Sequence, residues 1–328
     1  MNKYCSENIK SIKTIHPYFL INWHCTGWCN YHCPYCINNK WRCEWISEER
    51  KIEEAKRIND LIKRNNIKEA ISFRLIGGEP SFYNWPKILN HIERIDKIVF
   101  VTNFSNELDY YKKFYTYCKL RRIKLFVGVS KHEESIDFED KVIAITKWCK
   151  ENDMSPPQVV IIADSNFDDS NVKYLIKNGV TRIRISLLRS DVTQSNNLPQ
   201  KVKDLVYTYN RAYEKDRGKY RQFEVTFMDD TKEKFCNASD ITNLMENGGF
   251  NPEGFYCSSG PTTIAILPDS SVVRNKCDFL KDDILGNLLK DDIIIPTEPV
   301  LCQINKKFGT TNRCCSICSG TDFIRKDN

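Results

Sequence analysis

Residues 29–36 read Cys-Asn-Tyr-His-Cys-Pro-Tyr-Cys, which spaces Cys29, Cys33 and Cys36 as C-x3-C-x2-C. An apolar run from Tyr18 to Trp23 precedes them, so we expect the cysteines in the loop after the first strand. Three cysteine thiolates can hold three irons of a [4Fe–4S] cluster and leave the fourth iron open to an outside ligand. An open iron indicates chemistry at the cluster.

Short apolar runs alternate with helical patterns from residue 18 to about residue 216, which is typical of repeated βα units and a parallel sheet. The predicted strands are Tyr18 to Trp23, Ala70 to Ile76, Ile98 to Thr102, Lys124 to Ser130, Gln158 to Ala163 and Arg182 to Leu188. The predicted helices are Ser47 to about Arg64, Trp85 to Ile95, Glu107 to Leu120, Phe138 to Lys150, Asn171 to Asn178 and Pro199 to Lys215. Six strands, each followed by a helix, predict an α/β fold with a partial, TIM-like (β/α)6 barrel.

The pattern changes near residue 218, where we place a domain boundary. Residues 1–218 form the predicted barrel domain, and residues 219–328 form a small, loop-rich and cysteine-rich domain. Within the second domain, Thr262 to Leu267 and Val272 to Arg274 predict a β-hairpin, because Pro268-Asp269-Ser270-Ser271 between them is typical of a turn. Cys257 and Cys277 flank this hairpin.

Fifteen cysteines fall mainly into two groups, one near each end of the sequence. The groups are Cys5, Cys25, Cys29, Cys33, Cys36 and Cys43, and Cys257, Cys277, Cys302, Cys314, Cys315 and Cys318. Two such groups suggest two separate inorganic sites. The first residues lack the apolar region of a signal peptide, so we interpret the protein as cytoplasmic and its cysteines as metal or redox residues rather than a disulfide framework.

The composition excludes several classes of protein. With 41% apolar and 28% charged residues, the chain is neither disordered nor collagen-like. Its net charge of +6 comes from scattered residues, which argues against nucleic acid as a partner. No apolar run approaches the ~18 to 20 residues needed to cross a bilayer, so we expect no membrane partner.

The cysteine spacing resembles the radical S-adenosylmethionine (SAM) superfamily, and further positions from about residue 18 to residue 190 follow the same order. Gly77-Gly78-Glu79-Pro80, after the second predicted strand, resembles the motif that binds the amino group of SAM. The resemblance implies further SAM contacts by Asn103, beside Thr102, by Ser130, and by Tyr35 near the adenine. Residues 159–163 lack the family's glycines, which leaves the adenine contacts of that strand in doubt.

If the resemblance holds, it implies one-electron reduction of SAM by the cluster, cleavage of a C–S bond, and a 5′-deoxyadenosyl radical that takes hydrogen from a substrate. It also implies an electron donor such as flavodoxin or ferredoxin. The alternative interpretation of Cys29, Cys33 and Cys36 is a zinc knuckle. We assign no catalytic residue, although His24 and His132 lie at the ends of predicted strands.

The C-terminal cysteines resemble the SPASM/Twitch auxiliary-cluster domains, in which two cysteines flank a hairpin and a later C-x2-C completes a four-thiolate site. The resemblance implies a second [4Fe–4S] cluster, and its best ligand set is Cys257, Cys277, Cys315 and Cys318, with Cys302 and Cys314 as rivals. The match is incomplete, because the glycine expected before the second cysteine is missing and six cysteines are too few for two fully Cys-ligated clusters. A zinc site made by the same thiolates stays open.

Relatives with such C-terminal clusters often modify peptide or protein side chains, which makes a peptide the expected substrate in a peptide-modification role. Radical oxidation of a sugar or cyclitol alcohol is the alternative. From a different class, a structural zinc-binding interaction protein would use both cysteine groups without chemistry. It would be colourless and would not bind SAM.

Overall fold

Six parallel strands form most of a nine-stranded sheet in this computed structural model, and the last of them in the chain lies at one edge of the sheet. They are β2 (Tyr18–His24), β3 (Ala70–Ile76), β4 (Lys97–Thr102), β5 (Lys124–Lys131), β6 (Gln158–Ala163) and β7 (Ile183–Leu187), paired in chain order. The structure describes residues 5–14, 18–36, 43–187, 199–217, 223–235, 254–274, 284–302 and 323–325. Each predicted barrel strand is present within two residues of its expected bounds, and the partial barrel is confirmed.

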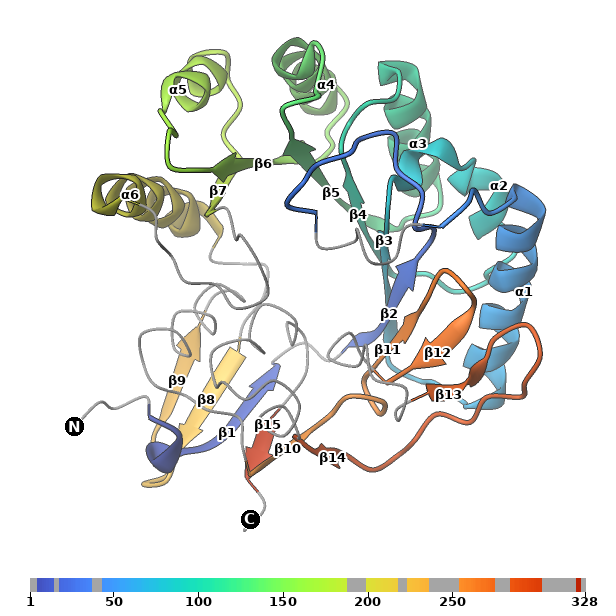
Figure 1. Cartoon of the computed structure of the whole chain (residues 1–328). Coiled ribbons are helices and arrows are strands. Elements are labelled where there is room, and N and C mark those ends of the chain that lie inside the picture. The colour runs from blue at the N-terminus through green and yellow to red at the C-terminus, as the bar shows by residue number, and fades with distance from the viewer. Residues whose placement is uncertain are drawn as a thin grey trace.

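Helices cover the outer side of the curved sheet, as Figure 1 shows. They are α1 (Glu48–Arg64), α2 (Trp85–Leu89), α3 (Leu108–Leu120), α4 (Phe138–Glu151), α5 (Ser170–Lys177) and α6 (Gln200–Arg217). Alternate strand residues such as Phe73 and Leu75 are fully buried against this layer. Among the described helices, none is long and apolar enough to cross a membrane.

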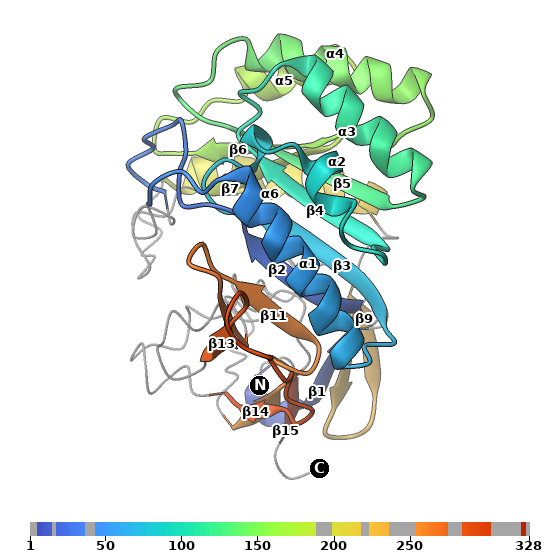
Figure 2. The same ribbon diagram turned by 90° about the vertical axis from the view of Figure 1, so that its right-hand side faces the viewer.

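α1 begins where the sequence predicts. The hydroxyl of Ser47 accepts from the backbone N–H of Arg50 at 3.3 Å, and Glu48 and Glu49 lie in the first turn, where negative charge favours a helix. Ile58 and Leu61 lie on its buried face. Figure 2 shows α1 lying along β2 and β3.

α2 is shorter than predicted, because it ends at Leu89 rather than at Ile95. The guanidinium of Arg121 donates to the carbonyl oxygens of Leu89 at 2.9 Å and Ile92 at 3.0 Å. The Leu89 carbonyl also accepts from the backbone N–H of Ile92 at 3.1 Å. A side chain 29 or more residues away in the sequence therefore binds carbonyls at and just after the end of this helix, which local periodicity does not reveal.

The predicted hairpin is present, and it continues the barrel sheet. β11 (Thr263–Ile266) runs parallel to β2, so that Ala265 lies opposite Asn22. β12 (Ser271–Val273) and β13 (Ile284–Asn287) follow as antiparallel strands. Residues beyond the predicted boundary at 218 therefore extend the sheet that carries the cysteine loop.

A second, six-stranded sheet joins the two ends of the sequence, in the order β14-β10-β15-β1-β8-β9. Its members are β1 (Ile9–Thr14), β8 (Phe223–Phe227), β9 (Lys232–Phe235), β10 (Phe255–Cys257), β14 (Val300–Leu301) and β15 (Phe323–Arg325). The expectation that the chain's first strand begins at Tyr18 is wrong, because β1 precedes it and pairs with β8 and β15. In Figure 1 this second sheet lies between the two ends of the curved nine-stranded sheet.

A buried polar network fastens the hairpin to the barrel. The Lys51 ammonium and the Glu54 carboxylate are both fully buried, and their nearest N and O atoms are 2.6 Å apart. The same carboxylate accepts from Nε1 of Trp23 on β2 at 2.8 Å and from the hydroxyl of Ser270, in the hairpin turn, at 2.7 Å. Three parts of the fold thus meet at one side chain, Glu54.

We expect Glu54→Gln to lower the free energy of unfolding by about 3–5 kcal/mol, because the buried ammonium of Lys51 would then face a neutral amide. The matched control is Glu53→Gln, since Glu53 pairs with Lys56 on the same helix at the same spacing, but both of those side chains are more than half exposed. That variant should lose at most about 1 kcal/mol. Anaerobic denaturant titrations of the iron-loaded proteins measure both, and equal losses would contradict the buried-pair account.

Candidate functional site

The loop that carries the cysteines is hydrogen-bonded to the backbone that continues β3. The N–H of Cys25 donates to the carbonyl of Ile76 at 2.7 Å, and the N–H of Gly78 donates to the carbonyl of Thr26 at 2.7 Å. The N–H of Glu79 then donates to the carbonyl of Trp28 at 2.9 Å. The two motifs identified in the sequence are therefore one piece of structure.

Gly77 and Gly78 are required by this contact. Gly77 has a φ of +135°, and a Cβ there would lie 2.4 Å from the carbonyl oxygen of Thr26. A Cβ on Gly78 would lie 1.7 Å from the carbonyl oxygen of Trp28. Both distances are far inside van der Waals contact, so only glycine allows the loop to approach. The sequence predicted close approach of a ligand at these residues, and the described neighbour is the cysteine loop itself.

The Glu79 carboxylate is fully buried at the carboxyl ends of β3 and β4. Its Oε1 accepts from the N–H of Ser81 at 2.8 Å and from the hydroxyl of Thr102 at 2.6 Å, while Oε2 accepts from the N–H of Asn103 at 2.6 Å. Burial raises the pKa of this carboxyl, and the hydrogen bonds oppose that shift. An ionised carboxylate has about four acceptor positions, and these three hydrogen bonds use three of them.

Asn103 connects the end of β4 to the cysteine loop. Its side-chain amide donates to Oδ1 of Asn30 at 2.8 Å and lies 3.7 Å from the sulfur of Cys29. Its own Oδ1 accepts from the N–H of Ser105 at 3.0 Å, which fixes the orientation of the amide. Ser130 is half-buried near the carboxyl end of β5, one strand further along the same edge of the sheet. The SAM contacts of these residues stay predictions.

Cys29, Cys33 and Cys36 share the loop, with Cys33 buried and the other two half-buried. Burial, with smaller contributions from the charges of Glu79, Cys36 and Cys33, raises the pKa of the Cys29 thiol to about 11, and a hydrogen bond from the backbone N–H of Tyr31 opposes the shift. Burial also raises the pKa of Cys33. Thiols this protonated are poor nucleophiles, whereas a bound metal deprotonates a coordinating thiol outright. The donor set therefore fits an iron–sulfur cluster.

No three His, Cys, Asp or Glu side chains in the described part of the chain converge on a point that would hold one metal ion. That arrangement is compatible with a cluster, in which each thiolate binds a different iron. Cys25 does not belong to the set, because it is fully buried in the core and its sulfur donates to the carbonyl of Trp23 at 3.2 Å.

No role is predicted for His132 from the sequence, and the structure places it against the cysteine loop. Its Nδ1 lies 3.4 Å from the sulfur of Cys33 and 3.1 Å from the hydroxyl of Tyr35. Burial lowers the pKa of His132, and the nearby Glu134 carboxylate opposes that shift. The only signal in the sequence was its position just after a predicted strand.

The C-terminal site is only partly within the described residues. Cys277, Cys314, Cys315 and Cys318 lie outside them. Cys257 is buried on β10 opposite Val300, and the N–H of Cys302 donates to the carbonyl of Phe255 at 2.8 Å. Since facing residues of an antiparallel pair share a side of the sheet and successive residues alternate, Cys257 and Cys302 lie on the same side as diagonal neighbours.

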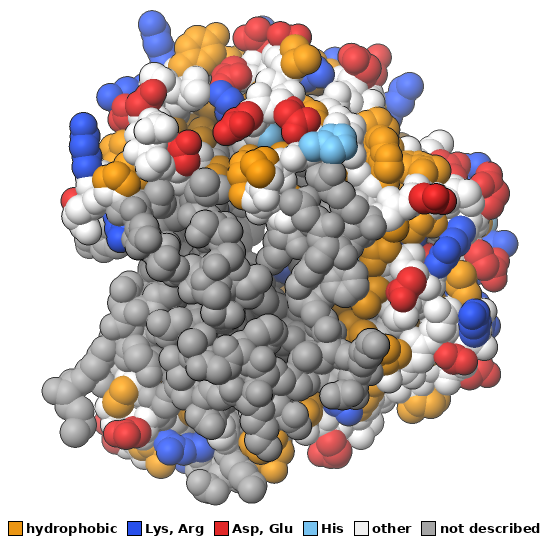
Figure 3. Space-filling model, in the orientation of Figure 1, with side chains coloured by type: hydrophobic (Ala, Val, Ile, Leu, Met, Phe, Trp, Pro, Cys, Tyr) orange, Lys and Arg blue, Asp and Glu red, His pale blue; other side chains and the backbone are white. Residues whose placement is uncertain are grey.

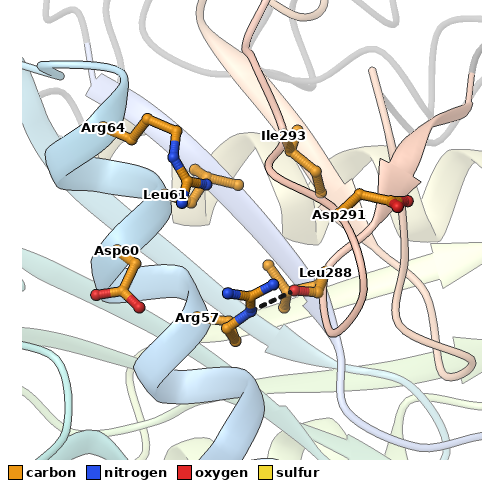
Figure 4. A pocket seen from close by; sticks show the side chains of 7 residues that line it. All are labelled: Arg57, Asp60, Leu61, Arg64, Leu288, Asp291 and Ile293. Atoms are coloured by element: carbon orange, nitrogen blue, oxygen red, sulfur yellow. Dashed lines mark hydrogen bonds between the residues drawn. The ribbon is translucent and has the colours of Figure 1, made fainter.

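A hollow between α1 and residues 288–293 lies away from these motifs (Figure 4). Arg57 donates from Nε to the carbonyl of Leu288 at 3.1 Å, and Arg64 pairs with Asp292 at 2.6 Å. Because these partners hold the two segments together, we interpret the hollow as a packing seam. On the face in Figure 3, the described acidic and basic side chains are interspersed, in line with the scattered charges of the sequence.

Residues 22–108 match the family of 4Fe-4S single cluster domains, and this stretch holds the cysteine loop, Glu79 and Asn103. By sequence the chain matches no curated protein. Its fold is similar to that of native anSMEcpe with bound AdoMet, with 14% identity, 84% of this chain and 79% of that chain covered, and a TM-score of 0.52. It is also similar to Streptococcus suis SuiB bound to S-adenosylmethionine, with 15% identity, 84% and 64% coverage, and a TM-score of 0.51.

The part of the partial barrel that carries the cysteine loop therefore matches an iron–sulfur cluster domain. The matched domain agrees with the iron–sulfur cluster expected at Cys29, Cys33 and Cys36, and the two solved structures show the fold that this chain shares with proteins that bind S-adenosylmethionine. This chain spans 64% of the length of SuiB.

We expect Gly78→Ala to displace the cysteine loop and to leave roughly half or less of the wild-type iron on the N-terminal cysteines, because the new Cβ would overlap the Trp28 carbonyl. Gly128→Ala on β5 is the control, since the nearest atoms to its Cβ would be 4.0 Å away. Iron and sulfide per chain after anaerobic reconstitution give the comparison. Full iron loading of Gly78→Ala would show that the close contact is not needed.

Proposed function

We propose that the protein is a radical SAM enzyme that abstracts hydrogen from a peptide or protein side chain. The observation that carries the proposal is the docking of the Cys29–Cys36 loop on Gly77–Glu79, since it puts three thiols, a buried carboxylate and Asn103 at one edge of a partial barrel. In barrel folds this carboxyl edge of the parallel strands is where active sites are built.

Cys29, Cys33 and Cys36 would hold the cluster, and the remaining acceptor position of Glu79 would receive the ammonium group of SAM. The cluster and SAM, if bound there, would supply one-electron radical chemistry for removing hydrogen from a substrate. The chain's own part is to fix the acceptor: Thr102 and Ser81 hold Glu79 in place before the ligand arrives. Asn103 keeps the cysteine loop against β4.

Side chains on the inner side of the sheet support the proposal of a polar substrate. Strand residues that alternate with the core-facing ones point to this side, and they include Arg74, half-buried on β3, and Arg184, exposed on β7. Guanidinium groups suit carboxylate and carbonyl acceptors, which a peptide supplies along its length. The resemblance of the C-terminal cysteines to peptide-modifying relatives adds to this support.

We expect the reconstituted wild type to bind about eight irons per chain and to cleave SAM when reduced, because two four-iron sites are proposed. The Cys29→Ala/Cys33→Ala/Cys36→Ala variant should keep about four irons and lose SAM cleavage. Iron, sulfide and zinc analysis with chromatography of 5′-deoxyadenosine gives both readings. Zinc without iron in the wild type would overturn the enzyme proposal.

The substrate class needs its own experiment. We expect a candidate peptide incubated with the reduced enzyme and SAM to change mass by loss of a hydrogen pair, as oxidation or crosslinking requires. Mass spectrometry measures the mass of the peptide after incubation. Sugar and cyclitol alcohols are incubated and measured in the same way as alternative substrates. Oxidation of an alcohol in that set with no change in any peptide would overturn the peptide proposal and leave the radical SAM activity standing.

For the second site we propose that Cys302 joins Cys257 as a ligand, because β10 and β14 bring them to one side of the sheet. Cys302→Ala and Cys257→Ala should each lower iron by about four per chain and leave the N-terminal cluster loaded. Cys118→Ala is the control, since Cys118 is buried in α3 among core residues. Unchanged iron in Cys302→Ala would remove Cys302 from the ligand set.

A further inference from the structure

Three atoms from two distant segments form a triangle at Cys33. Nδ1 of His132, in the loop after β5, lies 3.4 Å from the Cys33 sulfur and 3.1 Å from the Tyr35 hydroxyl. Tyr35 follows Cys33 by two residues in the same loop, so the three groups are neighbours. The triangle therefore links one proposed cluster ligand to two groups that each carry an ionisable proton.

The imidazole of His132 is held in place by its surroundings. The Tyr35 ring stacks on it, with 6.2 Å between ring centroids and 17° between the ring planes, and the Tyr31 ring meets it edge-on at 5.9 Å. The backbone N–H of His132 donates to the hydroxyl of Ser135 at 3.1 Å. The cysteine loop and the loop after β5 share a further hydrogen bond, in which the Glu134 carboxylate accepts from the backbone N–H of His32 at 2.7 Å. Nδ1 is thus aimed at the Cys33 sulfur by contacts on several sides.

The direction of the hydrogen bond follows from the chemistry of a coordinated thiolate. A cysteine bound to iron has lost its proton, so its sulfur can only accept hydrogen bonds. If Nδ1 presented its lone pair to that sulfur at 3.4 Å, two acceptors would face each other. The favourable arrangement has a proton on Nδ1, which donates to the sulfur directly or to Tyr35, whose hydroxyl then donates to the sulfur.

We propose that His132, together with Tyr35, raises the reduction potential of the cluster bound at Cys29, Cys33 and Cys36 by directing a hydrogen bond to the Cys33 sulfur. Hydrogen bonds to cluster sulfurs, like other outer-shell contacts, tune the potential of iron–sulfur centres. A hydrogen-bond donor stabilises the extra negative charge of the reduced cluster. The cluster therefore accepts an electron more readily from the protein that reduces it. His132 is on this account a positioning and tuning residue. The inference rests on the proposed function, since it requires a cluster on these cysteines.

The test is a potentiometric titration of the cluster followed by electron paramagnetic resonance, without SAM, in the iron-loaded full-length protein. We expect His132→Phe to shift the midpoint potential to a more negative value, because the phenyl ring keeps the stacking on Tyr35 but has no N–H. His132→Asn should restore the wild-type potential, since its amide nitrogen stands the same number of bonds from the backbone as Nδ1. His91→Phe, in the turn after α2, is the control and should leave the potential unchanged.

A second measurement covers the case in which the His132→Phe variant binds little iron. Electron–nuclear double resonance of the reduced cluster, in water and in deuterium oxide, detects exchangeable protons bonded to cluster sulfurs, and only loaded molecules contribute. We expect one such proton coupling to disappear in the His132→Phe/Tyr35→Phe double variant and to remain in His132→Asn.

An unchanged potential in loaded His132→Phe, or the same proton coupling in the double variant, would overturn the inference. Absence of iron from the reconstituted wild type would instead overturn the proposed function, so the two failures are distinguishable.

Discussion

The contact between the cysteine loop and the backbone of residues 77–79 is the constraint on which the rest of the site depends. Three backbone hydrogen bonds continue the pairing of β2 and β3 beyond the ends of these strands. Because each extra atom on the two glycines would collide with a loop carbonyl, the spacing of the loop and the identity of both glycines are determined together. Glu79 then follows directly at the buried end of β3, where β4 supplies its partners.

The barrel could be predicted because its strands are short apolar runs separated by amphipathic helices, so that local pattern and tertiary structure agree. The docked loop was only half predictable. The motifs were recognisable, yet their mutual contact depends on backbone atoms more than 45 residues apart, such as those of Cys25 and Ile76. His132 was visible only as a histidine after a strand, since its distances to Cys33 and Tyr35 follow from how the loops after β2 and β5 fold together.

The ends of the chain were the least predictable part. β1 is six residues long and has only two isoleucines, three positions apart among lysine, serine and threonine, so it lacks the alternation that marks a strand in the sequence. Its identity as a strand comes from β8 and β15, more than 200 residues further along. The hairpin of residues 263–273 was visible from its turn, but its parallel pairing with β2 was not, because sequence pattern does not say which strand edge a hairpin joins.

The position of β1 has a consequence for how the protein is made. Ser11 pairs on one side with Thr226 and on the other with Ile324, so more than 300 residues separate it from its last partner. At about 5–20 residues per second, a ribosome needs roughly 15 to 60 s to produce that partner after β1. The barrel strands and the cysteine loop are synthesised within this interval, while β1 still lacks its partner β15.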